Sequence, residues 1–146
     1  FNTCISIEHG LGYVLGCNKN VTTLLMRLAW LCKYQLVESL VKNGANIDLQ
    51  DEVGCTALVY SIQKTDIKMI KLLISLRANI NISDNLNQSP LVYAVRTKNA
   101  EIVELLLKSK IDPSIRNIIT GRTALDEAKA SRLQSIIELI EKYSAN

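Results

Sequence analysis

The chain repeats a short pattern about every 33 residues, and this period constrains its fold more than any other feature. Similar motifs begin at Thr23, Thr56 and Ser89, which are 33 residues apart, and again at Thr123, one residue late. The delay indicates one extra residue near positions 118–119. Units of this length bury their apolar surface by stacking on their neighbours. We therefore expect a stack of similar units.

The first helix of each unit is predicted to begin at a hydroxyl side chain. Thr56, Ser89 and Thr123 each precede an apolar run, and a hydroxyl there can accept from the N–H groups of the first helical turn. Pro90 follows Ser89 directly, at the position where a missing N–H costs least. The sequence therefore predicts helices that start next to these residues.

A second helix follows in each unit. Asp66 and Asn99 are predicted to cap two of these helices, and Gly44 suits a helix end. Apolar residues recur at helical spacing over 36–41 and over 102–107. Helices this short are marginal alone, so the two helices of a unit must pack on each other and on the next unit.

The best-preserved unit reads Asp51-x-x-Gly54-x-Thr56-Ala-Leu58 and closes with Ala78-Asn-Ile-Asn81. This pattern resembles the ankyrin repeat, and the resemblance covers about residues 18–142. It implies an all-α fold, an ankyrin-repeat solenoid of stacked helix-turn-helix units with hairpin-like loops. The resemblance divides the chain into residues 1–20 (a degraded repeat or an irregular N-terminal cap), repeats at 21–50, 51–83 and 84–116, and a C-terminal capping repeat at 117–146.

The chain departs from the family pattern at two sets of positions. The histidine of the signature is replaced by Met26, Val59, Val92 and Asp126. An apolar contact is expected to take its place in the first three repeats. The glycine between the two helices is also replaced, which predicts strained or altered turns at Cys32, Thr65, Lys98 and Arg132.

The sequence gives little support for catalysis or for a cofactor. Cys4, Cys17 and His9 could be imagined as a thiol–imidazole pair, but ordinary thiols beside a turn explain them better. The glycines at 10–16 lack the spacing of a nucleotide-binding loop, and no cysteine or histidine spacing suits a metal. We expect a protein that is not an enzyme and that needs no metal or cofactor.

Charge and hydropathy argue against two other classes of partner, nucleic acids and membranes. The formal net charge is +3, with acidic and basic residues interleaved, so no nucleic-acid partner is expected. No apolar run is long enough to span a bilayer, and no signal peptide is recognisable.

The four cysteines are expected to be thiols in a reducing compartment, the cytoplasm or nucleus, although two disulfides are the alternative. Secretion into a host cell is a weaker alternative.

The resemblance implies binding of another protein on a concave face, by a monomeric domain. Tyr60 and Tyr93 are expected side by side and facing outward, although packing between helices is the alternative. The full set of predicted partner-binding residues comprises Arg27, Trp30, Glu52, Val53, Tyr60, Gln63, Lys64, Asn85, Leu86, Tyr93, Arg96, Thr97 and Arg122. Two other roles remain open: a targeting domain of a larger enzyme, channel or pathogen effector, suggested by the Phe start, and a small stand-alone inhibitor.

Overall fold

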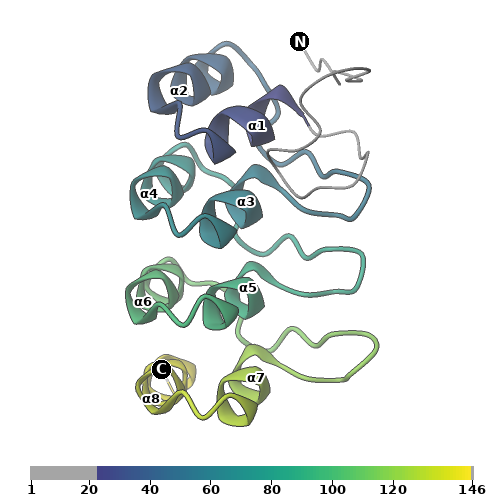
Figure 1. Cartoon of the computed structure of the whole chain (residues 1–146), viewed down its shortest axis with the longest axis vertical. Helices are drawn as coiled ribbons and strands as arrows, with labels where there is room; N and C mark the ends of the chain where they lie inside the picture. Colours follow the sequence, from purple (N-terminus) through teal and green to yellow (C-terminus); the bar gives the residue numbers. More distant parts are fainter. Residues whose placement is uncertain (1–22, 146) are drawn as a thin grey trace.

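The computed structural model describes residues 23–145, where the regular secondary structure consists of eight helices and no β-strand (Figure 1). The helices form two layers, and the hairpin-like loops project beyond the inner one. The inner layer contains α1 (Leu24–Trp30), α3 (Ala57–Gln63), α5 (Pro90–Arg96) and α7 (Ala124–Ala130). The outer layer contains α2 (Tyr34–Lys42), α4 (Ile67–Ser75), α6 (Ala100–Lys108) and α8 (Gln134–Ser144). The expected all-α solenoid is confirmed.

Stacking occurs mainly through the inner helices. Helix α1 packs on α3, α3 on α5 and α5 on α7, and each inner helix also packs on the outer helix that follows it. The core is aliphatic, and its largest fully buried side chains include Leu58, Ile62, Leu91 and Ile102. Burial of such side chains stabilises each by roughly 1.5–3 kcal/mol relative to exposure, so neighbouring repeats depend on one another.

The predicted helix starts are found at the expected residues. The hydroxyls of Thr56 and Thr123 accept from backbone N–H groups three residues later, at 3.4 Å and 3.2 Å. The carboxylate of Asp66 caps α4 in the same way, and the side-chain carbonyl of Asn99 caps α6 by accepting from the N–H groups two and three residues later. Ser89 occupies the equivalent position before α5, but its hydroxyl makes no capping bond, so that part of the prediction is wrong.

The positions that replace the signature histidine are apolar and buried in three repeats. Met26, Val59 and Val92 are all buried, as expected. The Sδ atom of Met26 also accepts from the backbone N–H of Thr23 at 3.5 Å. In the last repeat Asp126 does this instead, because its carboxylate accepts from the Thr123 N–H at 2.9 Å.

The turns between paired helices are left-handed although they lack glycine. Cys32, Thr65, Lys98 and Arg132 have φ values of 55°, 57°, 58° and 55°. Each such residue costs on the order of 1 kcal/mol relative to a right-handed conformation. The sequence prediction of strained turns is therefore confirmed, and stacking must offset this cost in every repeat.

Helix α8 is the last helix of the described stack. It buries Ile136 and Ile140 against the preceding helices. Its remaining surface exposes polar side chains, namely Arg132 in the preceding turn and Gln134, Glu138, Glu141 and Lys142 within the helix. None of the described helices has the length and apolar character that crossing a membrane requires. The predictions for residues 1–20, including Cys4, His9 and Cys17, lie outside the described residues.

Candidate functional site

Within residues 23–145, three hairpins project from the inner helices, and the last is one residue longer. Backbone hydrogen bonds close five-residue tips at 51–55 and 84–88, with N···O distances of 3.0 Å and 3.1 Å. The corresponding bond closes a six-residue tip at 117–122, at 3.0 Å. The extra residue expected near position 118 therefore lies in the tip itself.

The carboxylate of Asp51 joins the first of these hairpins to helix α3. Its Oδ1 atom accepts from the backbone N–H groups of Val53 at 3.1 Å and Cys55 at 2.8 Å. Its Oδ2 atom accepts from the hydroxyl of Tyr60 at 2.6 Å. One buried side chain thus shapes the hairpin and ties it to the helix.

Asp84 repeats this arrangement one repeat later. Its Oδ1 atom accepts from the N–H groups of Leu86 and Gln88, at 2.9 Å and 2.8 Å. Its Oδ2 atom accepts from the hydroxyl of Tyr93 at 2.7 Å. Burial and this hydrogen bond both raise the pKa of Tyr93 above its ordinary value. We refer to Asp51–Tyr60 and Asp84–Tyr93 as the two Asp–Tyr clamps.

The expectation that the two tyrosines face outward is wrong for Tyr60, which is only 6% exposed, whereas Tyr93 is half-buried and keeps part of its surface accessible. The edge of the Trp30 ring also packs on Tyr60, with ring centroids 6.3 Å apart and planes at 89°. The physical reason is the carboxylate nine residues earlier, which captures each hydroxyl. The sequence carries this signal as an Asp followed by Tyr at the same interval in two successive repeats.

Other predicted residues on the inner helices remain accessible. Gln63, Lys64 and Arg96 are exposed, whereas Arg27, Trp30 and Thr97 are half-buried. The Lys64 Nζ atom lies 5.0 Å from the centre of the Trp30 ring, and Arg96 Nε lies 3.1 Å from Glu127 Oε1. The inner-helix surface therefore offers amide and cationic groups in place of the expected tyrosine row.

Adjacent hairpins are joined to each other by backbone hydrogen bonds. The N–H of Asn85 donates to the carbonyl of Val53, and the N–H of Ile118 donates to the carbonyl of Leu86, both at 3.0 Å. The Asn85 side chain also donates to the Glu52 carbonyl at 2.7 Å. The predicted loop residues Glu52, Val53, Asn85, Leu86 and Arg122 are all exposed along this row. The three tips thus form one continuous, braced edge.

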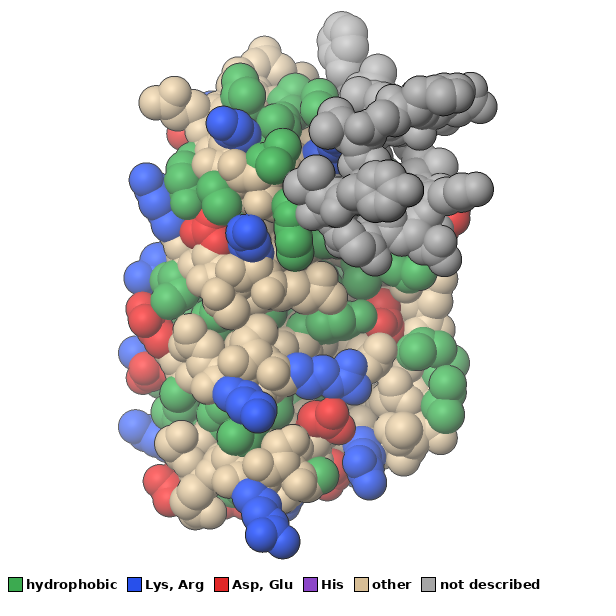
Figure 2. Space-filling view, in the orientation of Figure 1, with side chains coloured by type: hydrophobic (Ala, Val, Ile, Leu, Met, Phe, Trp, Pro, Cys, Tyr) green, Lys and Arg blue, Asp and Glu red, His purple; other side chains and the backbone are tan. Residues whose placement is uncertain are grey.

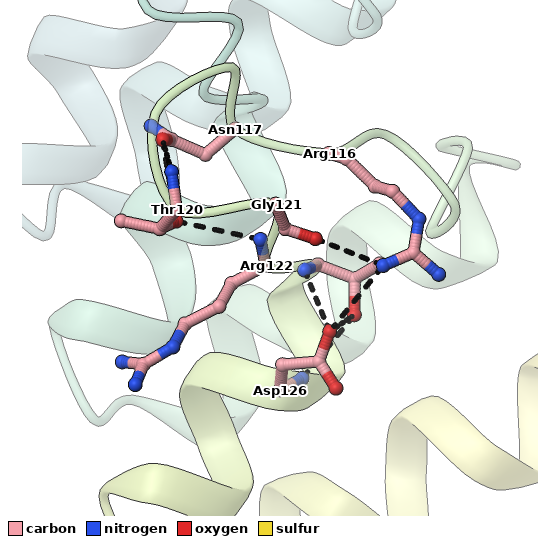
Figure 3. Close-up of polar contacts among 7 residues, drawn as sticks. Arg116, Asn117, Thr120, Gly121, Arg122 and Asp126 are labelled. Atoms are coloured by element: carbon pink, nitrogen blue, oxygen red, sulfur yellow. Dashed lines mark hydrogen bonds and ion pairs between the residues drawn. The ribbon is translucent and has the colours of Figure 1, made fainter.

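The last hairpin has no Asp–Tyr clamp, since Asn117 and Glu127 occupy the two positions. The Asn117 Oδ1 atom accepts from the backbone N–H groups of Ile119 and Thr120, both at 2.9 Å. The Arg116 side chain donates to the Gly121 carbonyl at 2.8 Å and lies 3.9 Å from Asp126 (Figure 3). Side chains at the surface therefore do here what a buried clamp does at Asp51 and a half-buried clamp does at Asp84.

A further polar cluster lies at the turn between the first two helices, and its role is structural. The hydroxyl of Tyr34 donates to Asp66 at 2.9 Å, and this bond raises the pKa of Tyr34 to about 12. Asp66 is itself the cap of α4. Within residues 23–145 no group of histidine, cysteine or acidic side chains could hold a metal ion. The cluster thus links two repeats.

Comparison with known proteins identifies the repeat. A family model described as ankyrin repeats in three copies matches residues 25–117. No curated protein matches the chain. The matched range covers α1 to α6 and the hairpins between them, which are the elements that carry both Asp–Tyr clamps.

Proposed function

Because the chain belongs to the ankyrin-repeat family, we propose that it binds another protein on its concave face, built from the inner helices and the hairpins. Ankyrin repeats are generally protein–protein interaction modules, and the family is typically non-catalytic. The proposal assigns the contact to residues on the inner helices and the tips. It does not require a metal, a cofactor or a reaction.

The observation that carries the proposal is the pair of Asp–Tyr clamps. Asp51 and Asp84 each hold a hairpin at one angle to its inner helix. Surfaces that are rigid before binding lose less conformational entropy when a partner docks. Gln63, Lys64 and Arg96 stand at the carboxyl ends of the clamped helices α3 and α5, and all three are exposed. These three residues are the inner-helix contacts we propose.

The partner's chemistry follows from these groups. Lys64 and Arg96 are cationic, and Arg is among the residues that most often dominate binding energy in protein interfaces. Arg96 already pairs with Glu127, which holds its guanidinium in one orientation. We expect acidic or amide side chains of the partner to lie over this part of the surface.

The test uses a triple variant and a matched control. Gln63, Lys64 and Arg96 are changed to Ala, and the control changes Gln35, Lys33 and Lys71 to Ala. Both sets replace one amide and two cations at exposed positions. A partner enriched by the wild-type protein is purified and titrated against all three proteins by calorimetry.

We expect the inner-helix variant to bind at least about tenfold more weakly, since several contacts of about 1 kcal/mol are lost together. The control should keep the wild-type affinity. Equal affinities for all three proteins would remove the inner helices from the binding face.

A further inference from the structure

The side chain of Cys55 lies between the two Asp–Tyr clamps. Cys55 ends the first hairpin, where its carbonyl accepts from the Asp51 N–H at 3.0 Å and its N–H donates to the Asp51 carboxylate at 2.8 Å. Its Sγ atom lies 3.6 Å from the hydroxyl oxygen of Tyr93, which belongs to the second clamp. The residue is buried, with 5% of its surface exposed. A single residue thus contacts both clamps.

The hydrogen bonds of Tyr93 decide which atom donates at this contact. A tyrosine hydroxyl has one hydrogen, and Tyr93 donates it to the Oδ2 atom of Asp84 at 2.7 Å. The Tyr93 oxygen therefore accepts from Cys55, and the thiol donates. A thiol is a weak donor, but hydrogen bonds in a chain strengthen one another. The chain from Cys55 through Tyr93 ends on Asp84, the carboxylate that shapes the second hairpin.

The second and third hairpins have no corresponding link within residues 23–145. Gln88 occupies the position of Cys55 one repeat later, and Glu127 occupies the position of Tyr93. The Gln88 side chain turns back and donates to Asp84 at 2.8 Å, whereas Glu127 pairs with a cation of α5. The last hairpin is therefore not connected to the second through the side chains that shape them.

Contact between the hairpin surfaces does not account for this difference. Backbone hydrogen bonds join the second hairpin to the first and the third to the second, both at 3.0 Å. Figure 2 shows the surface continuing without a break along the right-hand edge of the molecule, where the second and third hairpins project. The distinguishing feature of the first two hairpins is thus the bond from a thiol in one to the clamp of the other.

We propose that Cys55 couples the first two hairpins, so that they open and close together while the third opens separately. Loss of the thiol removes a donor that holds the Tyr93 hydroxyl toward Asp84. Loss of the hydroxyl leaves the buried thiol without this acceptor, and the coupling is therefore reciprocal. This inference concerns the free domain and goes beyond the proposed function, because it holds whether or not a partner is bound.

The test measures amide hydrogen exchange by NMR at two reporters in each hairpin. The reporters are N–H groups that donate to the side chain at the start of their own hairpin, so they exchange when that hairpin opens. They are Val53 and Cys55 in the first hairpin, Leu86 and Gln88 in the second, and Ile119 and Thr120 in the third.

The main variant is Cys55→Ala, which removes the thiol and keeps the backbone N–H. The matched control is Cys32→Ala, the same change at the other cysteine of the described chain, in the turn between α1 and α2. Tyr93→Phe and the double variant Cys55→Ala/Tyr93→Phe complete the cycle. Circular dichroism verifies that each variant is folded.

We expect Cys55→Ala to speed exchange of the second-hairpin reporters about threefold or more, the effect of losing one weak hydrogen bond. The third-hairpin reporters should keep their wild-type rates, and Cys32→Ala should leave all three hairpins unchanged. Tyr93→Phe should speed exchange at Val53 in the first hairpin. In the Tyr93→Phe background, Cys55→Ala should cause no further increase in the second hairpin, because the acceptor of the thiol is already absent.

Three results would overturn the proposal. Wild-type rates in the second hairpin of Cys55→Ala would show that the thiol carries no coupling. Equal acceleration in all three hairpins would indicate a general loss of stability. An undiminished effect of Cys55→Ala in the Tyr93→Phe background would show that the effect does not pass through the hydroxyl.

The reverse direction keeps the proposal testable if Cys55→Ala does not fold. An unchanged rate at Val53 in Tyr93→Phe would then overturn the coupling. None of these results bears on the proposed function, which fails if the inner-helix variant binds its partner as tightly as the wild type.

Discussion

The first two of the described hairpins, at 51–55 and 84–88, and the last one, at 117–122, have similar shapes that are held in different ways. Asp51 and Asp84 each shape a tip and tie it to a helix through a tyrosine hydroxyl. The last hairpin relies on Asn117 and on Arg116, whose side chain is 67% exposed. Contacts shielded from water are worth more than exposed ones, so the difference predicts a gradient of stability along the stack. The family pattern thus determines the shape of a hairpin but not how firmly it is held.

The glycines of the two kinds of hairpin give the strongest test of this comparison. Gly54 and Gly121 are both left-handed, with φ of 85° and 66°. A Cβ atom at Gly54 would lie 2.5 Å from the Asn85 backbone nitrogen, whereas one at Gly121 would meet nothing within 4 Å. Gly54→Ala should cost about 3 kcal/mol, and Gly121→Ala only about 1 kcal/mol from backbone strain. Urea denaturation measures both, and equal losses would contradict the comparison.

The clamp carboxylate should have the next largest effect. Asp84→Ala removes the acceptor for two backbone N–H groups, the Gln88 amide and the Tyr93 hydroxyl. Hydrogen bonds to a charged group contribute about 1.5–3 kcal/mol, so we expect a loss of about 2 kcal/mol. Asn117→Ala in the last hairpin should lose about 1 kcal/mol, because its acceptor is neutral. Thermal unfolding of the two variants would rank the hairpins, and a reversed rank would count against the clamps.

The tyrosine of the second clamp makes the comparison dependent on pH. Tyr93 has a pKa raised by burial and by its bond to Asp84, so its contribution is complete below the ordinary tyrosine value. That contribution is lost as the pH rises through the raised pKa. Tyr93→Phe should cost about 1 kcal/mol at neutral pH, and the difference from the wild type should shrink above about pH 10. Urea midpoints measured across this range provide the check, and a gap that widened would have the wrong sign.

The smallest effect is expected at the exposed contact of the last hairpin. Arg116 lies 3.9 Å from Asp126, and exposed ion pairs contribute about 0–1 kcal/mol. Arg116→Ala should therefore change the unfolding free energy by less than about 0.5 kcal/mol. Hydrogen exchange should become faster for the amides at 117–122, and the loss of local stability calculated from these rates should exceed the loss of global unfolding free energy. A global loss as large as that of Asp84→Ala would show that the last hairpin is held as firmly as the others.

Local sequence signals predicted most of the fold because each acts within one or two helical turns. The caps at Thr56 and Asp66, and the left-handed turns at Thr65 and Lys98, depend on neighbouring residues only. The 33-residue period then predicted that the units stack on one another. The extra residue near Ile118 was also predicted, although its place within the tip needed the structure.

The direction of the tyrosines could not be predicted in the same way. Helical register alone placed Tyr60 and Tyr93 on an outward-facing position, but a flexible ring turns toward the strongest acceptor within reach. Asp51 lies in the hairpin and Tyr60 in helix α3. Only the folded hairpin brings the Asp51 Oδ2 atom within 2.6 Å of the Tyr60 hydroxyl. The row of exposed apolar side chains at the tips was predicted only in part, for a similar reason. Val53 and Leu86 were among the predicted partner-binding residues, but their alignment with Ile118 and Ile119 depends on hairpin stacking.

The extra residue in the last tip has a consequence for redesign of the chain. The six-residue tip at 117–122 is still closed by the bond from the Asn117 N–H to the Arg122 carbonyl, and the Ile118 N–H still donates to the Leu86 carbonyl, both at 3.0 Å. The longer tip therefore accommodates its extra residue without losing the bond to the neighbouring hairpin. Loop closure entropy rises only slowly with loop length. The hairpin ends are therefore natural points for grafting foreign peptide segments, each displayed at a set distance from the next on a scaffold that need not be redesigned.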